Sequence, residues 1–211
     1  MKIQRFIGDV HGKYDQYKRI LAQGPNTIQV GDMGVGFRRW PHGEVYGNPP
    51  HYAMVPHNHR FIRGNHDNPA VCVQHSQWIK DGHIEDGMMF VGGATSIDKE
   101  FRRPEFSWWR DEECSQELLD ELRDKYVAAK PQVMVTHDCP EFVAHELFKR
   151  HYKVDLEPGS TRTRRALEQM WHLHRPKLWV FGHWHESRDV MVESTRFVCL
   201  AELEAKDFDV S

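Results

Sequence analysis

Five short segments of the chain place carboxylate, imidazole or amide side chains directly after apolar runs. In sequence order they are Asp9-Val10-His11, Gly31-Asp32, Gly64-Asn65-His66-Asp67, His137, and Gly182-His183-Trp184-His185. Side chains of these types bind metal ions and transfer protons. Each segment alone has a structural alternative, since Asp and Gly form turns and a single histidine is often satisfied within a core. Five such segments in one chain favour a shared metal site.

The last segment carries the clearest geometric signal. His183 and His185 flank one residue, and side chains alternate along an extended chain, so both imidazoles would face the same side. Trp184 between them also suits core packing. This segment therefore fits a pair of metal ligands.

These residues need elements that bring them together. We expect strands at residues 3–7, 27–30, 60–63, 132–136 and 177–181, each closed by a turn former, and further strands at 88–91, 189–192 and 196–200. Helical patterns lie at residues 14–22, 115–129 and from 160 or 161 to 174, with Ser115 as an N-cap. Such alternation indicates an α/β layered fold, in which ligands bind beyond the carboxyl ends of the strands. Residues 34–59 have no clear period and are predicted to form a long functional loop or an insertion.

The composition is that of a globular protein without a dominant charge. Lys and Arg number 28 against 31 Asp and Glu, so any affinity for nucleic acid or membranes must come from a local patch. No apolar run approaches the roughly 20 residues needed to cross a bilayer, and no repeat or linker divides residues 1–211, which we expect to form one domain. The four cysteines form no C-x-x-C pair, so we expect no disulfides and a cytoplasmic location.

Together, the five segments resemble the motif blocks of the calcineurin-like metallophosphoesterase superfamily, in the same order over residues 8–185. The resemblance implies a four-layer α/β/β/α sandwich, with two mixed sheets flanked by helices and a dinuclear metal site at its edge. One ion would be held by Asp9, His11, Asp32 and His185. The other would be held by Asp32, Asn65, His137 and His183, with the Asp32 carboxylate bridging both.

This ligand set suits phosphate chemistry. Two divalent ions bring four positive charges, and Asp9, Asp32 and a bridging hydroxide remove three, so the site attracts an anionic phosphate ester. Mixed nitrogen and oxygen donors suit Mn²⁺, which we expect, or Fe, Zn, Co or Ni, better than Ca²⁺ or Mg²⁺. Ions about 3.5–4 Å apart lower the pKa of a bridging water and clamp the phosphoryl oxygens for in-line attack, so no protein nucleophile is needed.

Three further residues could act on the substrate. By resemblance, His66 lies near the leaving-group oxygen and protonates it, a contribution of about 10²–10⁴-fold. Asp67 would hold the His66 imidazole in the right tautomer and raise its pKa, or cap residues 69–74. Arg102, in a segment similar to one found in small bacterial and phage phosphoesterases, could contact phosphate through its guanidinium fork, or be a surface charge beside Arg103.

Other positions separate the chain from the protein phosphatases of this superfamily. Those enzymes carry G-D-x-x-D-R-G, whereas Val35 and Gly36 stand here in place of the second Asp and the Arg, with Arg38 and Arg39 shortly after as possible substitutes. Three groups are expected to be ordinary: the helix face with Arg162, Arg164 and Arg165 solvated, Trp108 and Trp109 covering the core rather than stacking on a base, and the remaining histidines, including His57, His59, His172 and His174, on the surface.

We therefore predict a hydrolase in which a metal-bridging hydroxide attacks a phosphomonoester of a small molecule or nucleotide. The alternative is a phosphodiesterase acting on cyclic nucleotides or nucleic acid, since both classes share these motifs. A non-catalytic scaffold is a distant alternative, because every ligand position and His66 are intact. No feature of the sequence specifies an oligomer.

Overall fold

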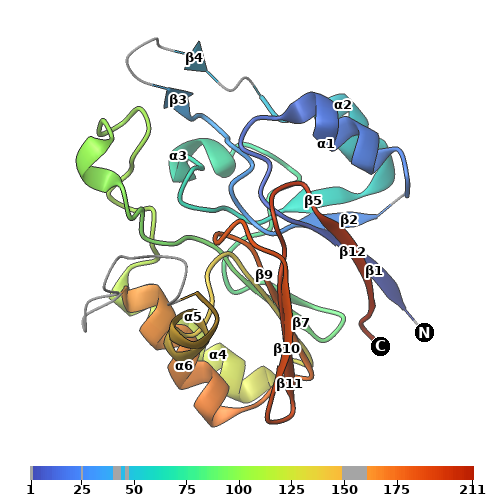
Figure 1. The fold of residues 1–211 in the computed structure, drawn as a ribbon, viewed down its shortest axis with the longest axis vertical. Coiled ribbons are helices and arrows are strands. Elements are labelled where there is room, and N and C mark those ends of the chain that lie inside the picture. The colour runs from blue at the N-terminus through green and yellow to red at the C-terminus, as the bar shows by residue number, and fades with distance from the viewer. Residues whose placement is uncertain (1, 25, 40–43, 46–47, 149–160) are drawn as a thin grey trace.

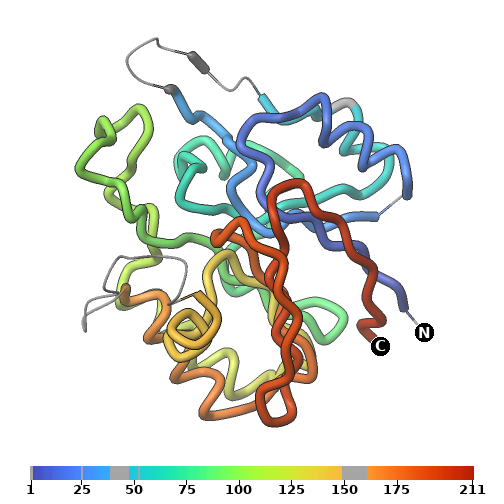
Figure 2. Tube along the Cα trace, viewed as in Figure 1, coloured from blue at the N-terminus to red at the C-terminus, as the bar shows by residue number. Residues whose placement is uncertain are grey.

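Two β-sheets pack face to face, with helices on both outer sides (Figure 1), in a computed structural model that describes residues 2–24, 26–39, 44–45, 48–148 and 161–211. The first sheet has the order β12-β1-β2-β5, with β1 (Ile3–Ile7), β2 (Thr27–Gln29), β5 (His59–Phe61) and β12 (Ala205–Asp209). β1, β2 and β5 are parallel, and β12 runs antiparallel to β1, so the last strand lies beside the first (Figure 2).

The second sheet has the order β10-β11-β9-β8-β7-β6. Its parallel strands are β7 (Met88–Val91), β8 (Val133–Thr136), β9 (Leu178–Phe181) and β11 (Thr195–Cys199). Its antiparallel edges are β6 (Ile84–Glu85) and β10 (Arg188–Val192). A separate ribbon joins β3 (Arg38–Arg39) to β4 (Glu44–Val45).

Within the part of the chain that the structure describes, helices cover each sheet on its outer side. The first sheet is covered by α1 (Tyr14–Leu21), α2 (His51–Met54) with the 3-10 turn η1 (Val55–His57), and α3 (Pro69–Cys72). The second is covered by α4 (Gln116–Ala129), α5 (Glu141–Phe148) and α6 (Arg162–Leu173), and the turn η2 (Lys99–Phe101) lies outside both groups. Ser115 caps α4 as predicted, by accepting a hydrogen bond from the Leu118 amide at 3.2 Å.

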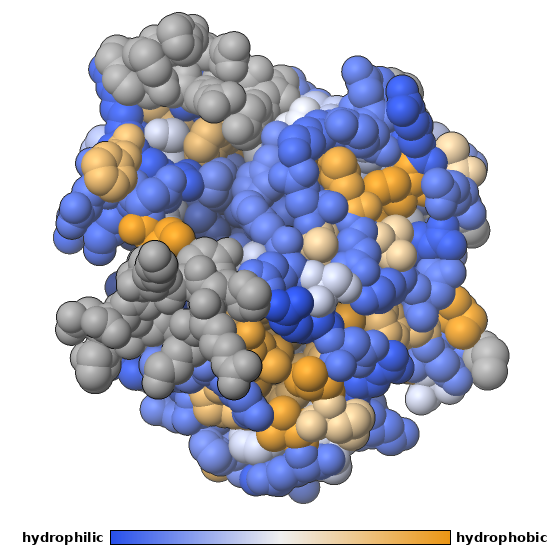
Figure 3. Space-filling view, in the orientation of Figure 1, coloured by the Kyte–Doolittle hydropathy of each residue, from blue (hydrophilic) through white to orange (hydrophobic). Residues whose placement is uncertain are grey.

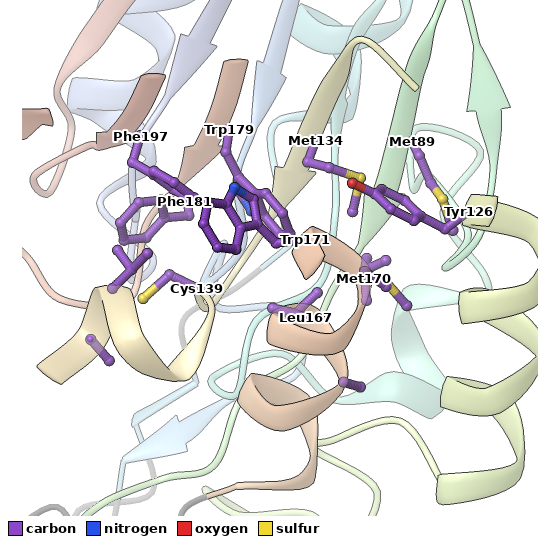
Figure 4. Close-up of a cluster of buried hydrophobic side chains, with 14 of the residues drawn as sticks. Met89, Tyr126, Met134, Cys139, Leu167, Met170, Trp171, Trp179, Phe181 and Phe197 are labelled. Carbon is purple, nitrogen blue, oxygen red and sulfur yellow. The ribbon is translucent and has the colours of Figure 1, made fainter. Parts of the chain in front are cut away.

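The central strands β7, β8 and β9 of the second sheet are buried along their whole length, and the alternation of their side chains divides the core. In β9, Leu178 and Val180 face the first sheet, whereas Trp179 and Phe181 face α4–α6 (Figure 4). Three buried clusters therefore separate four layers, and the predicted four-layer α/β/β/α sandwich is confirmed. The face in Figure 3 is mostly hydrophilic with separate apolar patches, and no helix among the described residues is long and apolar enough to cross a membrane.

Two expectations need correction. The stretch 34–59 is not a plain loop, because its described residues form the ribbon β3–β4, the helix α2 and the turn η1. His59, expected on the surface, is fully buried in β5, where its Nδ1 lies 3.0 Å from Oγ1 of Thr27 on the neighbouring strand. The expected surface position of His59 is wrong because β5 pairs with β2 beneath the helices.

Candidate metal centre

The predicted ligands lie together where the carboxyl ends of the two sheets meet. Asp9 follows β1 and Asp32 follows β2, while His137 and His183 follow the neighbouring strands β8 and β9 of the other sheet. Their donor atoms form two groups in which all atoms lie within 4.8 Å of one another. The groups are Asp9, His11, Asp32 and His185, and Asp32, His137 and His183. Asp32 belongs to both, as the resemblance implies for a bridging ligand.

The first group has converging nitrogen and oxygen atoms. Nε2 of His11 and Nε2 of His185 lie 2.9 Å apart, and Nε2 of His185 lies 3.1 Å from Oδ2 of Asp9. Nε2 of His11 lies 3.7 Å from both Oδ2 of Asp9 and Oδ2 of Asp32. Two imidazole nitrogens pointed at each other between two carboxylates mark a position suited to a cation.

The second group is built around His137. Its Nδ1 lies 2.9 Å from the Val30 carbonyl oxygen, which fixes the proton on Nδ1 and turns Nε2 toward the site. That Nε2 lies 3.1 Å from Oδ1 of Asn65 and 3.3 Å from Oδ1 of Asp32. Asn65 thus joins the group, and three atoms that could bind a cation face one point.

The electrostatics of the centre require positive charge. Asp9 and Asp32 are almost fully buried, and burial alone would raise their pKa values. Their histidine neighbours outweigh burial and hold both pKa values below the usual range. Burial also opposes charge on His137, but the charge of Asp32 overrides it and raises the pKa of His137 to about 10. Two buried carboxylates without a metal thus draw a proton onto a histidine, and bound cations could supply that charge instead.

Four of the proposed ligands adopt a left-handed backbone. The φ angles are 47° at His11, 59° at Asp32, 69° at His183 and 55° at His185. This conformation costs residues other than glycine about 1–3 kcal/mol each and clusters at functional sites. The fold holds it in place: the amides of Val10 and His11 both donate to the Asp32 carbonyl oxygen, at 2.9 and 2.8 Å.

Glycine precedes several ligands because the donor atoms pack against the backbone. A Cβ at Gly64 would lie 2.1 Å from Oδ1 of Asp32 and 2.7 Å from Nε2 of His137. A Cβ at Gly182 would lie 2.3 Å from Oδ1 of Asp9. The types of donor atom, their convergence on two points and the close packing of ligand atoms against Gly64 and Gly182 all fit a pair of divalent ions.

His66 lies beside the ligands without joining either group. Its ring stacks on Phe37 at 4.9 Å and meets the His11 ring edge-on at 4.6 Å, while its backbone amide donates to Oδ1 of Asp32 at 2.7 Å. Nε2 accepts a hydrogen bond from Nη2 of Arg102 at 2.7 Å. Burial lowers the pKa of His66 to about 3, which keeps the ring neutral and able to accept this bond.

The prediction that Asp67 orients His66 is wrong. The Asp67 carboxylate is fully buried and accepts hydrogen bonds of 2.7–3.2 Å from the amides of Met33, Gly34, Val35 and Gly64. Asp67 therefore ties the segment after β2 to the segment after β5. It does not cap residues 69–74 either, since Asn68 accepts the hydrogen bond from the Ala70 amide at 3.0 Å.

Arg102 lies at the site rather than on the open surface. Its Nε donates to Oδ1 of Asp98 at 2.5 Å and its Nη1 to the Ser107 carbonyl at 3.2 Å, which leaves Nη2 directed at His66. A cleft of about 340 Å³ opens beside these groups. Its lining combines proposed ligands with other residues: Asp32, Asn65, His183 and His185 with His66, Ile97, Asp98, Arg102, Arg164 and Trp184.

Arg164 was expected on a solvated helix face, and the structure corrects this. It is 2% exposed, its Nε donates to Oδ2 of Asp138 at 2.7 Å, and its guanidinium lies 4.8 Å from the Trp184 ring centre. The pair stabilises both charges: burial raises the pKa of Asp138, but the charge of Arg164 outweighs it and lowers that pKa.

Two of the remaining aromatic and basic candidates, Trp109 and Arg38, contact aromatic rings. Trp109 is buried and its ring meets Phe37 at 6.0 Å, as expected for a residue that covers the core. Arg38 lies over the Phe106 ring at 5.7 Å. Sequence reasoning missed Ser96 and Glu112, which form a buried hydrogen-bonded pair behind Asn65.

Comparison with known proteins identifies the family. The model of the calcineurin-like phosphoesterase family matches residues 5–187. The solved structure of TT1561 from Thermus thermophilus has 12% identity and a TM-score of 0.52, with 100% of each chain covered. A putative 5'-nucleotidase from Staphylococcus aureus has 11% identity and a TM-score of 0.51, with 98% of this chain and 50% of that chain covered.

These identities show a shared fold and no more, and no curated protein matches the chain in sequence. The family match covers most of the chain and includes every proposed ligand. The chain therefore belongs to the calcineurin-like phosphoesterase family and is a metal-dependent hydrolase of phosphate esters.

Proposed function

We propose that residues 1–211 act as one catalytic domain that hydrolyses phosphomonoesters of small molecules or nucleotides in the cytoplasm. The observation that carries this proposal is the charge of the ligand set. Only Asp9 and Asp32 among the seven proposed ligands are anionic, so two divalent ions would leave the centre positive. A monoester dianion meets that charge better than a diester monoanion. The four cysteines are buried and free, which suits a reducing compartment.

The proposed ligands of one ion are Asp9, His11, Asp32 and His185, and those of the other are Asp32, Asn65, His137 and His183. Two ions there would supply an activated water and draw charge from the phosphoryl oxygens. We propose Mn²⁺, because mixed imidazole, carboxylate and amide donors suit the later divalent metals, with Fe, Zn, Co or Ni as alternatives.

Two side chains would serve the substrate directly. Arg102 is held by Asp98 and Ser107 with Nη2 over His66, and a phosphate in the cleft offers that Nη2 a charged acceptor in place of a neutral imidazole. Once Arg102 turns to the phosphate, its charge no longer opposes protonation of His66 and the phosphate anion favours it, so Nε2 of His66 could take a proton from solvent and pass it to the leaving-group oxygen. Arg102 would thus bind the substrate and His66 would act as the general acid.

A phosphodiesterase is the second candidate, and one observation favours it. A second hollow, which reaches Lys13, Phe37 and Phe101, meets the cleft at His66 and His185. Two hollows that join at the centre leave space for substituents on both sides of a phosphorus atom.

The test compares an aryl phosphomonoester with an aryl phosphodiester on protein loaded with Mn²⁺, after metal analysis of the purified chain. Faster turnover of the monoester is expected. Turnover of the diester alone would replace the first proposal with the second. An Asp32→Asn variant serves as the control for contaminating phosphatases, because it removes the bridging carboxylate.

A further inference from the structure

A buried carboxylate with no part in the chemistry above lies behind the proposed ligand Asn65. Glu112 is 4% exposed and Ser96 is 1% exposed. The backbone amide of Ser96 donates to Oε1 of Glu112 at 2.9 Å, and its hydroxyl donates to Oε2 at 2.6 Å. Nδ2 of Asn65 in turn donates to Oγ of Ser96 at 3.1 Å.

The Glu112 carboxylate determines which groups donate and which accept in this chain of hydrogen bonds. A carboxylate only accepts, so the Ser96 hydroxyl must point its hydrogen at Glu112. The oxygen of that hydroxyl then has only lone pairs to offer Asn65. The amide can satisfy it only with Nδ2, which leaves Oδ1 facing Nε2 of His137 at 3.1 Å.

The orientation matters because the two ends of an amide are opposite in character. Oδ1 can coordinate a cation, whereas Nδ2 would direct two N–H donors at it. We propose that Glu112 and Ser96 are positioning residues that hold the Asn65 amide with its oxygen toward the metal, and so set the affinity for the second ion. The inference rests on the proposed role of Asn65 as a ligand.

Metal affinity, measured by calorimetry on the metal-free protein titrated with Mn²⁺, tests this directly. Ser96→Ala and Glu112→Gln are each expected to weaken one of the two Mn²⁺ binding steps, that of the site with Asn65, by about 10–100-fold, as loss of a partner behind a ligand commonly does. The matched control is Thr195→Val, which also removes a buried hydroxyl, one that accepts from Nε1 of Trp171 at 3.0 Å at the far end of β11. This control should lose stability but bind both ions as the wild type does.

A second background separates positioning from general damage. Asn65→Asp places two equivalent oxygens at this position, so there is no orientation to set. Ser96→Ala is therefore expected to weaken the second site when Asn65 is present and to have little effect when combined with Asn65→Asp. Equal losses in both backgrounds, or unchanged affinity in Ser96→Ala, would overturn the inference. A wild-type chain that binds fewer than two ions would instead contradict the proposed metal centre itself.

Discussion

Nη2 of Arg102 donates a 2.7 Å hydrogen bond to Nε2 of His66, the atom from which His66 would protonate a leaving group. Arg102 and His66, the two residues proposed to act on the substrate, are therefore hydrogen-bonded to each other in the protein without substrate. Phosphate in the cleft would separate them, because a charged oxygen is a stronger acceptor than a neutral imidazole. Arg102 and His66 thus make separate, measurable contributions.

Arg102→Ala is expected to lower kcat/KM for a phosphomonoester by about 10–100-fold, the effect of losing one charge-assisted hydrogen bond. Arg102→Lys should recover only part of the loss, since an ammonium lacks the planar fork. Steady-state kinetics on Mn²⁺-loaded protein measure both. Arg103→Ala, which alters the neighbouring arginine stacked over Phe106 at 4.2 Å, is the control and should have little effect. Full activity in Arg102→Ala would exclude a substrate contact.

His66→Asn is expected to lower kcat by about 10²–10⁴-fold for esters with poor leaving groups, which need a general acid. The loss should be much smaller for p-nitrophenyl phosphate, whose leaving group departs without a proton. Comparing rates across leaving groups of rising pKa gives the measurement. Metal content should stay at the wild-type level, because His66 belongs to neither ligand group. Equal activity of variant and wild type on every ester would refute the acid role.

Removal of individual ligands should change metal stoichiometry in a defined way. Asp32 belongs to both groups, so Asp32→Asn is expected to impair binding of both ions. Asn65→Ala should impair only one, because Asn65 contacts His137 and not the first group. Metal content per chain after dialysis, measured by mass spectrometry, distinguishes the two results. Identical stoichiometry in both variants would argue against Asp32 as the bridge.

Asp67→Asn should reduce stability more than chemistry. The buried carboxylate accepts from four backbone amides, and an Asn amide would set its own N–H groups against some of them. We expect the free energy of unfolding to fall by about 2–3 kcal/mol. Denaturant unfolding of the metal-free protein measures this, with the exposed Asp15→Asn as a control expected to change little. Wild-type stability with lost activity would restore a catalytic role for Asp67.

His59 predicts how stability responds to acid. Burial lowers the pKa of His59 to about 4, so the folded state binds this proton less readily than the unfolded state, whose histidine pKa is about 6.5. Stability is therefore lost as pH falls from about 6.5 toward 4, by roughly 1–3 kcal/mol. Unfolding of metal-free wild type and His59→Gln at several pH values tests this. The variant should lose less stability than the wild type over that range; parallel curves would contradict the prediction.

The metal ligands could be found from sequence because each is tied to a local pattern. An apolar strand closed by a turn former and a polar residue fixes the place of that residue at the carboxyl edge of a sheet. His137 and His183, 46 positions apart, come together because β8 and β9 are neighbouring parallel strands. The strand pattern thus carries most of the information about the centre.

No comparable sequence pattern predicts which way a side chain points or which distant residue it contacts. Asp67 adjoins His66 in sequence, yet the turn sends its carboxylate toward the amides of Met33 to Val35. Arg164 likewise reads as one charge among three on a helix, and only the tertiary contact with Asp138 explains its burial. Ser96 and Glu112 are 16 positions apart and resemble ordinary polar residues, so their pairing behind Asn65 needed the structure.

The left-handed backbone at His11, Asp32, His183 and His185 also restricts how this centre can drift during evolution. A β-branched residue at any of these positions meets a backbone penalty before its side chain makes a contact, whereas Gly, Asn or Asp relieves it. Homologues that abandon catalysis should therefore accumulate those three residues there first. A descendant with valine or isoleucine at one of these positions would have had to rebuild the turn itself.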